Sequence, residues 1–303
     1  MMAFAVRILV TLLIFILIFR HIDLASVLEN LRQADPRYLA VGIAMQGIST
    51  LIASVRWHLV MQALGFGQDL RFYLRSYFKG MFFNQGLPTS IGGDALRVMD
   101  VARAGGHRKT EAFYGVFVDR VLGLSSLLLL NLFAFVMNPA LLPPAVAMPI
   151  SAVVAAGVFG FVLFYHLRRI QALAHVRGVK VFHELSERMN LVFTGWRASA
   201  TQLVLSVTVH IFTVVGMYML GRGVGLGYDL ATYMVIVPPV LLLTVVPISL
   251  AGWGVREGAM IGLFLLIGAD KSSVLSMSVL YGLVLIVISL PGLYIYLTGK
   301  HRI

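Results

Sequence analysis

The chain contains no cysteine and few charged residues for its 303 positions. Without a thiol it can form no disulfide, no thiolate nucleophile and no Cys-ligated zinc or iron–sulfur site. Only 12% of its residues are charged, about half the share in an average soluble domain. With 59% hydrophobic residues and a mean hydropathy of +0.90, the chain cannot cover a water-soluble fold with polar surface. We therefore predict an integral membrane protein.

Acidic residues are scarcer than basic ones, and the net charge is +11. In a membrane protein such an excess belongs on cytoplasmic loops and attracts anionic lipid headgroups, so we expect membrane lipids, and not nucleic acid, as partners. Sequence motifs for a Walker loop, a dinucleotide site, a nucleophile elbow or an H-E-x-x-H metal site do not occur. We expect no cofactor and no metal.

Long apolar stretches predict an all-α, polytopic helix bundle that forms a single membrane domain over residues 1–303. A spanning helix needs about 20 mostly apolar residues. The candidates are residues 4–20, 38–61, 110–137, 144–166, 200–221 and 272–298. We expect the first helix to stay uncleaved, because Arg20 to Asp23 follow it without a small-residue cleavage site.

Two further apolar regions, 71–103 and 230–268, are interrupted by the same pattern of residues. The first contains Pro88, Ser90, Gly93 and Arg97, and the second contains Pro247, Ser249, Gly252 and Arg256, each pair 159 positions apart. Proline breaks a helix and glycine permits a tight reversal. Each region therefore predicts a re-entrant hairpin, and such paired breaks are a pointer to a transporter's substrate site.

The distribution of Lys and Arg predicts the topology. If both broken regions are re-entrant, most cations fall on one side, which leaves Arg20, Arg32, Arg37, Arg222 and Lys271 on the other. This asymmetry favours cytoplasmic N- and C-termini in the cell inner membrane. Residues 38–137 and 200–298 then form two halves of an inverted-topology repeat. Residues 168–197, with apolar residues at three- and four-residue spacing, predict an amphipathic connector on the cytoplasmic surface.

The first break offers an anion site. Ser90, Gly92 and Gly93 precede a short helix that we expect to begin near Asp94, and free N–H groups at a helix start favour an anion. Asp94 is either the N-cap of that helix or a site residue. Arg97, in the first turn, needs an anion nearby, which is either Asp94 or a substrate phosphate. Asn84 either caps the break or lines a cavity.

The second break repeats this arrangement. Ser249, Gly252 and Gly254 lead into a helix that carries Arg256 and Glu257. We interpret Arg256 as a substrate contact. Glu257 is its partner, a helix-start acid or a proton carrier.

Two charged residues, Asp119 and Arg120, lie well inside the third predicted span. Charges at that depth usually face the protein interior. We expect Asp119 to meet Arg97, and Arg120 to meet Asp94 or Glu257, either as a structural ion network or as one that a lipid phosphate opens. Arg56 is expected to extend to the membrane surface from a helix end, and His210 to be a hydrogen-bonded structural residue.

At these motifs the chain resembles the membrane region of the lysylphosphatidylglycerol synthases, also called the flippase-like family. The resemblance rests on N-x-x-x-P-x-x-x-G-G-D-x-x-R from Asn84 to Arg97, on Asp119-Arg120, and on the run from Gly252 to Gly258. It implies a multi-helix inner-membrane protein that moves lipids, with functional roles for Pro88, Gly92, Gly93, Asp94, Arg97, Asp119, Arg120, Arg256 and Glu257. Ala251 departs from the glycine or proline of many relatives. The chain also ends at Ile303 without a soluble aminoacyl-transfer domain, so we expect no lipid lysinylation.

These observations favour translocation of an anionic lipid, such as a phospholipid or a polyprenyl-phosphate-linked glycolipid, and we expect no enzymatic activity. Two alternatives stay open. One is an intramembrane transferase that acts on a lipid phosphate, with Asp119 or Glu257 as base. The other is a membrane scaffold for enzymes of lipid or glycan synthesis. The oligomeric state is open.

Overall fold

The computed structural model describes residues 2–86, 92–106, 108–171 and 178–299. In this part of the chain every regular element is helical. The elements are α1 (Met2–His21), α2 (Leu24–Arg32), α3 (Pro36–Ala63), α4 (Leu70–Gly86), α5 (Gly92–Gly105), α6 (Lys109–Met137), α7 (Pro144–His166), η1 (Leu167–Arg169), α8 (Lys180–Val192), α9 (Trp196–Gly223), α10 (Leu230–Val245), α11 (Val255–Leu265) and α12 (Lys271–Thr298).

The predicted helix bundle is confirmed. Five helices in the described ranges are long and apolar enough to cross a membrane: α3, α6, α7 with η1, α9 and α12. The sixth predicted span corresponds to α1, which together with α2 forms a pair bent by 92°. Large apolar side chains such as Leu9, Phe133 and Leu297 are mostly exposed, because a bundle in lipid does not need to hide its outer surface.

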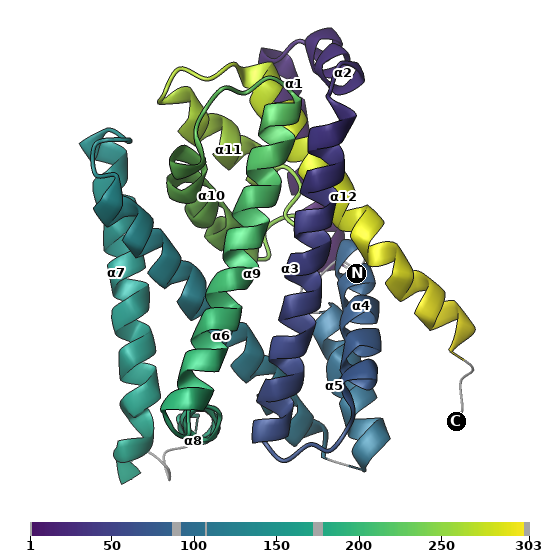
Figure 1. Ribbon diagram of the computed structural model, residues 1–303, viewed down its shortest axis with the longest axis vertical. Coiled ribbons are helices and arrows are strands. Elements are labelled where there is room, and N and C mark those ends of the chain that lie inside the picture. Colours follow the sequence, from purple (N-terminus) through teal and green to yellow (C-terminus); the bar gives the residue numbers. More distant parts are fainter. Residues whose placement is uncertain (1, 87–91, 107, 172–177, 300–303) are drawn as a thin grey trace.

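The centre of the bundle is the antiparallel pair α3 and α9, which run side by side along the long axis (Figure 1). Small residues permit their close approach, since a Cβ on Gly42 would lie 3.2 Å from the carbonyl oxygen of Gly216. Ser49 and Thr213 are hydrogen-bonded across the pair at 3.0 Å. Small residues and polar cross-links of this kind hold helices together in lipid, where the hydrophobic effect contributes little.

The two broken regions lie at opposite ends of this central pair. Figure 1 draws α4 and α5 beside the lower half of α3, and α10 and α11 beside the upper half of α9. Each pair folds back on itself, since α4 packs on α5 and α10 packs on α11. This is the arrangement that two oppositely directed hairpins would have. The re-entrant insertion and the inverted repeat stay predictions, because no membrane position is defined.

Pro88 and Ser90, in the first predicted break, lie outside the described residues, which resume at Gly92 after α4 ends at Gly86. The helix after this break begins at Gly92, two residues earlier than predicted. Asp94 is therefore inside the first turn, and its interpretation as the N-cap is wrong. The two helices approach closely at two glycines, because a Cβ on Gly93 would overlap the carbonyl oxygen of Gly80. Gly93 is thus a packing residue of the α4–α5 hairpin.

The second break spans residues 246–254. Pro238 and Pro239 do not interrupt α10 and lie inside it. The reversal uses Gly252 and Gly254, with φ of 81° and 85°, and also Ala251 with φ of 49°. A non-glycine residue in this region carries strain of about 1–2 kcal/mol. This strain falls at Ala251, the position where the family resemblance implies a glycine or a proline.

Helix α1 contacts this break. The hydroxyl of Thr11 accepts the Leu250 N–H at 3.0 Å, and Ile14 packs over Gly254. Phe15 lies against Trp253, with ring centroids 6.3 Å apart. Trp253 is therefore packed between helices.

The loops that enter the two broken regions share a sequence and a local geometry that the sequence analysis missed. Gly65 to Leu70 and Gly225 to Leu230 both read G-x-G-x-D-L. The first glycine of each has a positive φ, 87° at Gly65 and 84° at Gly225, which ends α3 and α9 in the same way. Asp69 and Asp229 then each accept an N–H three residues later, at 2.9 Å in both cases. This second repeated motif favours an internal repeat.

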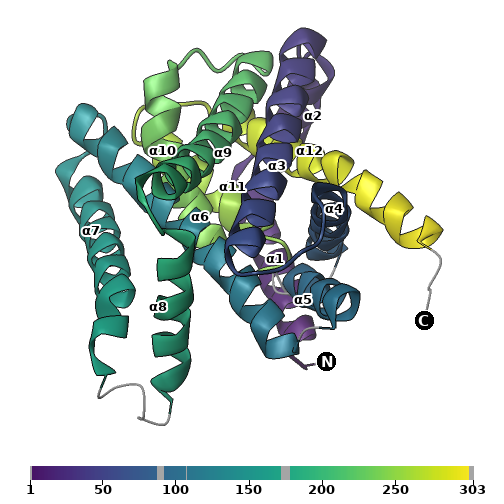
Figure 2. The ribbon, with the colours of Figure 1, turned by 60° about the horizontal axis from the view of Figure 1, so that its bottom comes forward.

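Within the predicted connector, residues 168–197, the described part contains a shorter α-helix, α8, from Lys180 to Val192. It is seen end-on in Figure 1 and from the side in Figure 2, so its axis crosses the long axis of the bundle. Leu185, Met189 and Val192 are buried against α3 and α6, while Phe182 and Trp196 are exposed. The apolar face of α8 is thus mostly occupied by the protein, with Phe182 left outside, and the exposed Trp196 begins the next helix, α9.

Candidate functional site

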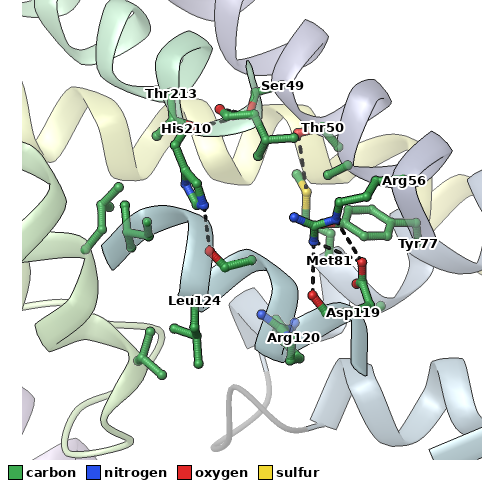
Figure 3. Close-up of a pocket in the computed structure, with 18 of the residues that line it drawn as sticks. Ser49, Thr50, Arg56, Tyr77, Met81, Asp119, Arg120, Leu124, His210 and Thr213 are labelled. Atoms are coloured by element: carbon green, nitrogen blue, oxygen red, sulfur yellow. Dashed lines mark hydrogen bonds and ion pairs between the residues drawn. The ribbon is translucent and has the colours of Figure 1, made fainter. Parts of the chain in front are cut away.

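A cavity of about 360 Å³ lies between α3, α4, α5, α6, α9 and α10, with Tyr281 of α12 on its wall. Figure 3 shows its labelled side chains around the opening, with Arg56, Asp119 and Arg120 on one side and Ser49, Thr213 and His210 on another. This volume is at the lower end of the range of small-molecule pockets. The residues of the first broken region and of the third span converge on this cavity.

A linear chain of ion pairs forms one wall. Arg56 contacts Asp119 at 2.9 Å, and the other oxygen of Asp119 contacts Arg97 at 2.9 Å. Arg97 also contacts Asp94 at 3.1 Å, and Asp94 accepts two hydrogen bonds from Arg120, at 2.8 and 3.0 Å. The expected pairs Asp119–Arg97 and Arg120–Asp94 are confirmed. This row of ion pairs joins α3, α5 and α6, so it fixes the α4–α5 hairpin to the bundle.

The middle of this chain is inaccessible. The side chains of Arg97 and Asp119 are only 4% and 3% exposed. The guanidinium of Arg97 lies between two aromatic rings, 3.9 Å from the centroid of Trp57 and 4.9 Å from that of Tyr77. Buried charges are tolerated only when each is paired and hydrogen-bonded, and cation–π contacts add to that stabilisation. Asp119 thus compensates two buried arginines, Arg56 and Arg97.

Arg120, at one end of this row of ion pairs, is accessible from the cavity. The side chain of Arg120 is 48% exposed although it belongs to a spanning helix, and it lines the cavity. The lining includes three arginines and two aspartates, which leaves one net positive charge when His210 is neutral. A cavity with this charge, walled by low-dielectric protein, attracts an anion.

Arg56 is placed differently from the prediction. It does not extend to the membrane surface: it is 5% exposed and about two turns inside the end of α3. It donates hydrogen bonds to the carboxylate of Asp119 and to the Ser206 hydroxyl. The missed signal is a polar stripe on one face of α3, formed by Gln46, Ser49, Thr50 and Arg56.

The opposite wall of the cavity is polar but uncharged. Ser49 donates to the carbonyl of Val209 at 2.9 Å, and Thr50 donates to that of Gln46 at 3.0 Å. Nε2 of His210 lies 2.8 Å from the carbonyl oxygen of Gly123, which confirms His210 as a hydrogen-bonded residue. It also lines the cavity, as Figure 3 shows.

The start of α5 is already capped by the protein. The side-chain oxygen of Asn84 accepts the N–H of Gly93 at 2.9 Å, and Asn84 also lines the cavity. Both readings of Asn84 are therefore correct. The prediction that the N–H of Gly93 is free for an anion is wrong in this conformation, because that donor is occupied. Gly92 begins the helix and is not among the described lining residues.

The second break does not contribute its arginine to the cavity. Arg256 and Glu257 are 3% and 0% exposed and are paired at 2.6 Å. Glu257 also accepts the N–H of Gly254 at 2.6 Å and the hydroxyl of Ser278 at 3.0 Å. Glu257 is thus both the partner of Arg256 and a helix-start acid, as predicted. Ser249 and Gly252 are buried but, like this pair, are not among the described cavity residues.

Tyr281 links the two regions. Its ring lines the cavity on one side and lies 5.5 Å from the guanidinium of Arg256 on the other. Trp253 covers Arg256 at 4.8 Å. Both hairpin arginines, Arg97 and Arg256, are therefore placed between a tryptophan and a tyrosine, but only Arg97 reaches the cavity.

Fold and site together define a class: a multi-pass helical membrane protein whose interior holds a polar cavity with buried ion pairs. The lysylphosphatidylglycerol synthase transmembrane region matches residues 4–292. The chain belongs to that family, as its motifs indicated.

Individual relatives are distant. The chain is 26% identical over 129 residues to a UPF0104 membrane protein of Methanocaldococcus jannaschii, and 27% identical over 128 residues to one of Pyrococcus horikoshii. Each match covers 42% of this chain and 38% of the relative. A UPF0104 membrane protein of Methanothermobacter thermautotrophicus is 18% identical over 283 residues, covering 84% of this chain and 81% of the relative.

Proposed function

We propose that this protein moves an anionic lipid between the leaflets of the cell membrane, without changing it chemically. The observation that carries the proposal is the half-exposed Arg120 in an interior cavity with one net positive charge. A permanent structural network would gain nothing from leaving one guanidinium accessible. A lipid phosphate gains a charge-assisted, bidentate partner there.

The proposed step is an exchange of partners. The phosphate binds Arg120 in place of Asp94, while the lipid tails stay outside in the bilayer. Asp94 keeps its contact with Arg97, so no buried charge is left without a partner. A low cost of exchange is what a carrier needs, because the headgroup must leave again.

We propose that each hairpin opens the cavity to one leaflet of the membrane. The α4–α5 and α10–α11 pairs lie at opposite ends of the α3–α9 pair (Figure 1), and in our proposal they open in turn. The end with α4, α5 and α8 carries most of the Lys and Arg residues and is proposed to face the cytoplasm, with both termini, at the inner membrane. In our proposal Arg256 contacts the lipid phosphate in the conformation that opens to the other leaflet.

The test is leaflet exchange in proteoliposomes that contain a fluorescent phosphatidylglycerol, measured by bleaching of the outer leaflet. Arg120→Gln is expected to slow exchange by at least about tenfold, because a charged contact to the phosphate is lost. Arg222→Gln, an exposed arginine at the end of α9, is the matched control and should exchange lipid at the unmodified rate.

The alternatives give different outcomes in the same vesicles. A transferase would convert the lipid into a product with a different mass. A scaffold would neither exchange nor convert lipid, and Arg120→Gln would then change nothing. Either result would refute translocation by this chain.

A further inference from the structure

The uncharged wall of the cavity bears on which headgroup would fit, an inference that rests on the proposed function. The hydroxyl protons of this wall are already donated to hydrogen bonds within the protein. Ser49 donates to Val209, so Thr213 must donate to Ser49 in the 3.0 Å contact between them, and Thr50 donates to Gln46. What these three side chains still offer is oxygen lone pairs.

Two more acceptors lie on the same wall. A carbonyl oxygen only accepts, so Nε2 of His210 must donate to Gly123, which makes Nδ1 of the neutral ring an acceptor. The amide oxygen of Gln46 is buried and has no hydrogen-bond partner among the described residues. Leaving a buried acceptor unpaired is costly. A ligand donor that reaches this oxygen when the Gln46 side chain turns towards the cavity would remove this cost.

The donors of the ligand should not carry charge. Both carboxylates of the cavity are occupied: Asp119 by Arg56 and Arg97, and Asp94 by Arg97 and Arg120. After the phosphate takes Arg120, Asp94 remains paired with Arg97, and Asp119 with Arg56 and Arg97. An ammonium group would therefore have to share a carboxylate that already compensates a buried arginine. Hydroxyl groups supply donors without needing a counter-charge.

We infer that the cavity selects a headgroup with one phosphate and neutral hydroxyls, and discriminates against a headgroup that carries an ammonium group. The phosphate binds at Arg120, and the hydroxyls donate to the wall formed by Gln46, Ser49, Thr50, His210 and Thr213 (Figure 3). The volume of about 360 Å³ equals that of about a dozen waters. It therefore admits a headgroup of the size of glycerol phosphate or a single sugar phosphate.

The inference is tested by the affinity of the purified protein for three dioctanoyl lipids, measured by native mass spectrometry. Phosphatidylglycerol has the phosphate and hydroxyls, phosphatidylmethanol has the phosphate alone, and phosphatidylethanolamine has an ammonium group. We expect affinity to fall in that order, with about a tenfold difference between the first two from the lost hydrogen bonds.

Variants show whether the acceptor wall is responsible. Thr213→Val and, independently, Gln46→Leu should bring phosphatidylglycerol towards the affinity of phosphatidylmethanol and leave phosphatidylmethanol unchanged. Thr201→Val, an exposed threonine on the same helix as Thr213, is the control and should retain the preference. Two acceptor variants are used so that poor folding of one does not decide the result.

The outcomes separate the two proposals. Equal affinity for phosphatidylglycerol and phosphatidylmethanol, or tighter binding of phosphatidylethanolamine, overturns the headgroup inference. If Arg120→Gln still weakens all anionic lipids in that case, the lipid site itself stands. If Arg120→Gln has no effect on any lipid, both proposals fail.

Discussion

At the scale of single residues, the carboxylate of Asp119 neutralises two arginines at once. It is buried and compensates Arg56 and Arg97, which come from two other helices. The sequence indicated that a charge at this depth must have a partner, but it could not show that one acid serves two arginines. The short distance of Arg56 from the predicted helix end favours a position at the membrane surface, whereas the polar stripe that it continues along α3 indicates the interior, where the structure places it.

Asp119→Asn is therefore expected to destabilise the fold strongly. Two buried guanidinium groups lose their common counter-charge, and breaking a buried pair in this way costs about 3–5 kcal/mol. The measurement is thermal or denaturant unfolding in detergent. Glu187→Gln, an exposed acid whose side chain is 59% accessible, should change stability by at most about 1 kcal/mol. Equal losses in the two variants would contradict a structural role for the ion-pair chain.

At the scale of elements, the contact between α4 and α5 depends on glycine. Gly80 and Gly93 face each other so closely that neither leaves room for a side chain. The Asn84 amide, which accepts the N–H of Gly93, closes the same contact. The repeated Pro, Ser, Gly and Arg pattern located this hairpin, but it suggested an anion site at the helix start. The structure instead uses the second glycine of the pair for packing.

Gly93→Ala should weaken the hairpin. The new methyl group overlaps the Gly80 carbonyl, and forced overpacking costs about 1–3 kcal/mol. The control is Gly160→Ala in α7, where a Cβ meets nothing within 4 Å. That change should be neutral or stabilise by up to about 1 kcal/mol through helix propensity. Unfolding in detergent compares the two, and a Gly93→Ala variant as stable as the control would exclude the tight contact.

At the scale of the whole molecule, the arrangement to test is the placement of the two broken regions at opposite ends of the α3–α9 pair (Figure 1). The G-x-G-x-D-L loops at Gly65 to Leu70 and Gly225 to Leu230 mark the entry to each region. If the halves are inverted in the membrane, these equivalent loops must lie on opposite sides of it. Their shared local geometry makes them a matched pair for a topology experiment.

The absence of native cysteine makes that experiment direct. Gly67→Cys and Gly227→Cys each place a thiol in open space, since a Cβ at either position meets nothing within 4 Å. In sealed vesicles of one orientation, a membrane-impermeant maleimide should label one variant and not the other, and in inverted vesicles the result should reverse. Labelling of both from the same side would refute the two opposed hairpins.

The sequence by itself determined the membrane class, the helix bundle and the positions of the spans, because these depend on hydropathy and local turn chemistry that each segment carries alone. It also determined which charges had to be paired, since an isolated charge in lipid is too costly. The choice of partners was decided only by tertiary structure. Helix packing brought Arg56 to Asp119, placed Tyr281 between the cavity and Arg256 and left Arg120 open, because these contacts depend on crossing positions of helices far apart in the chain.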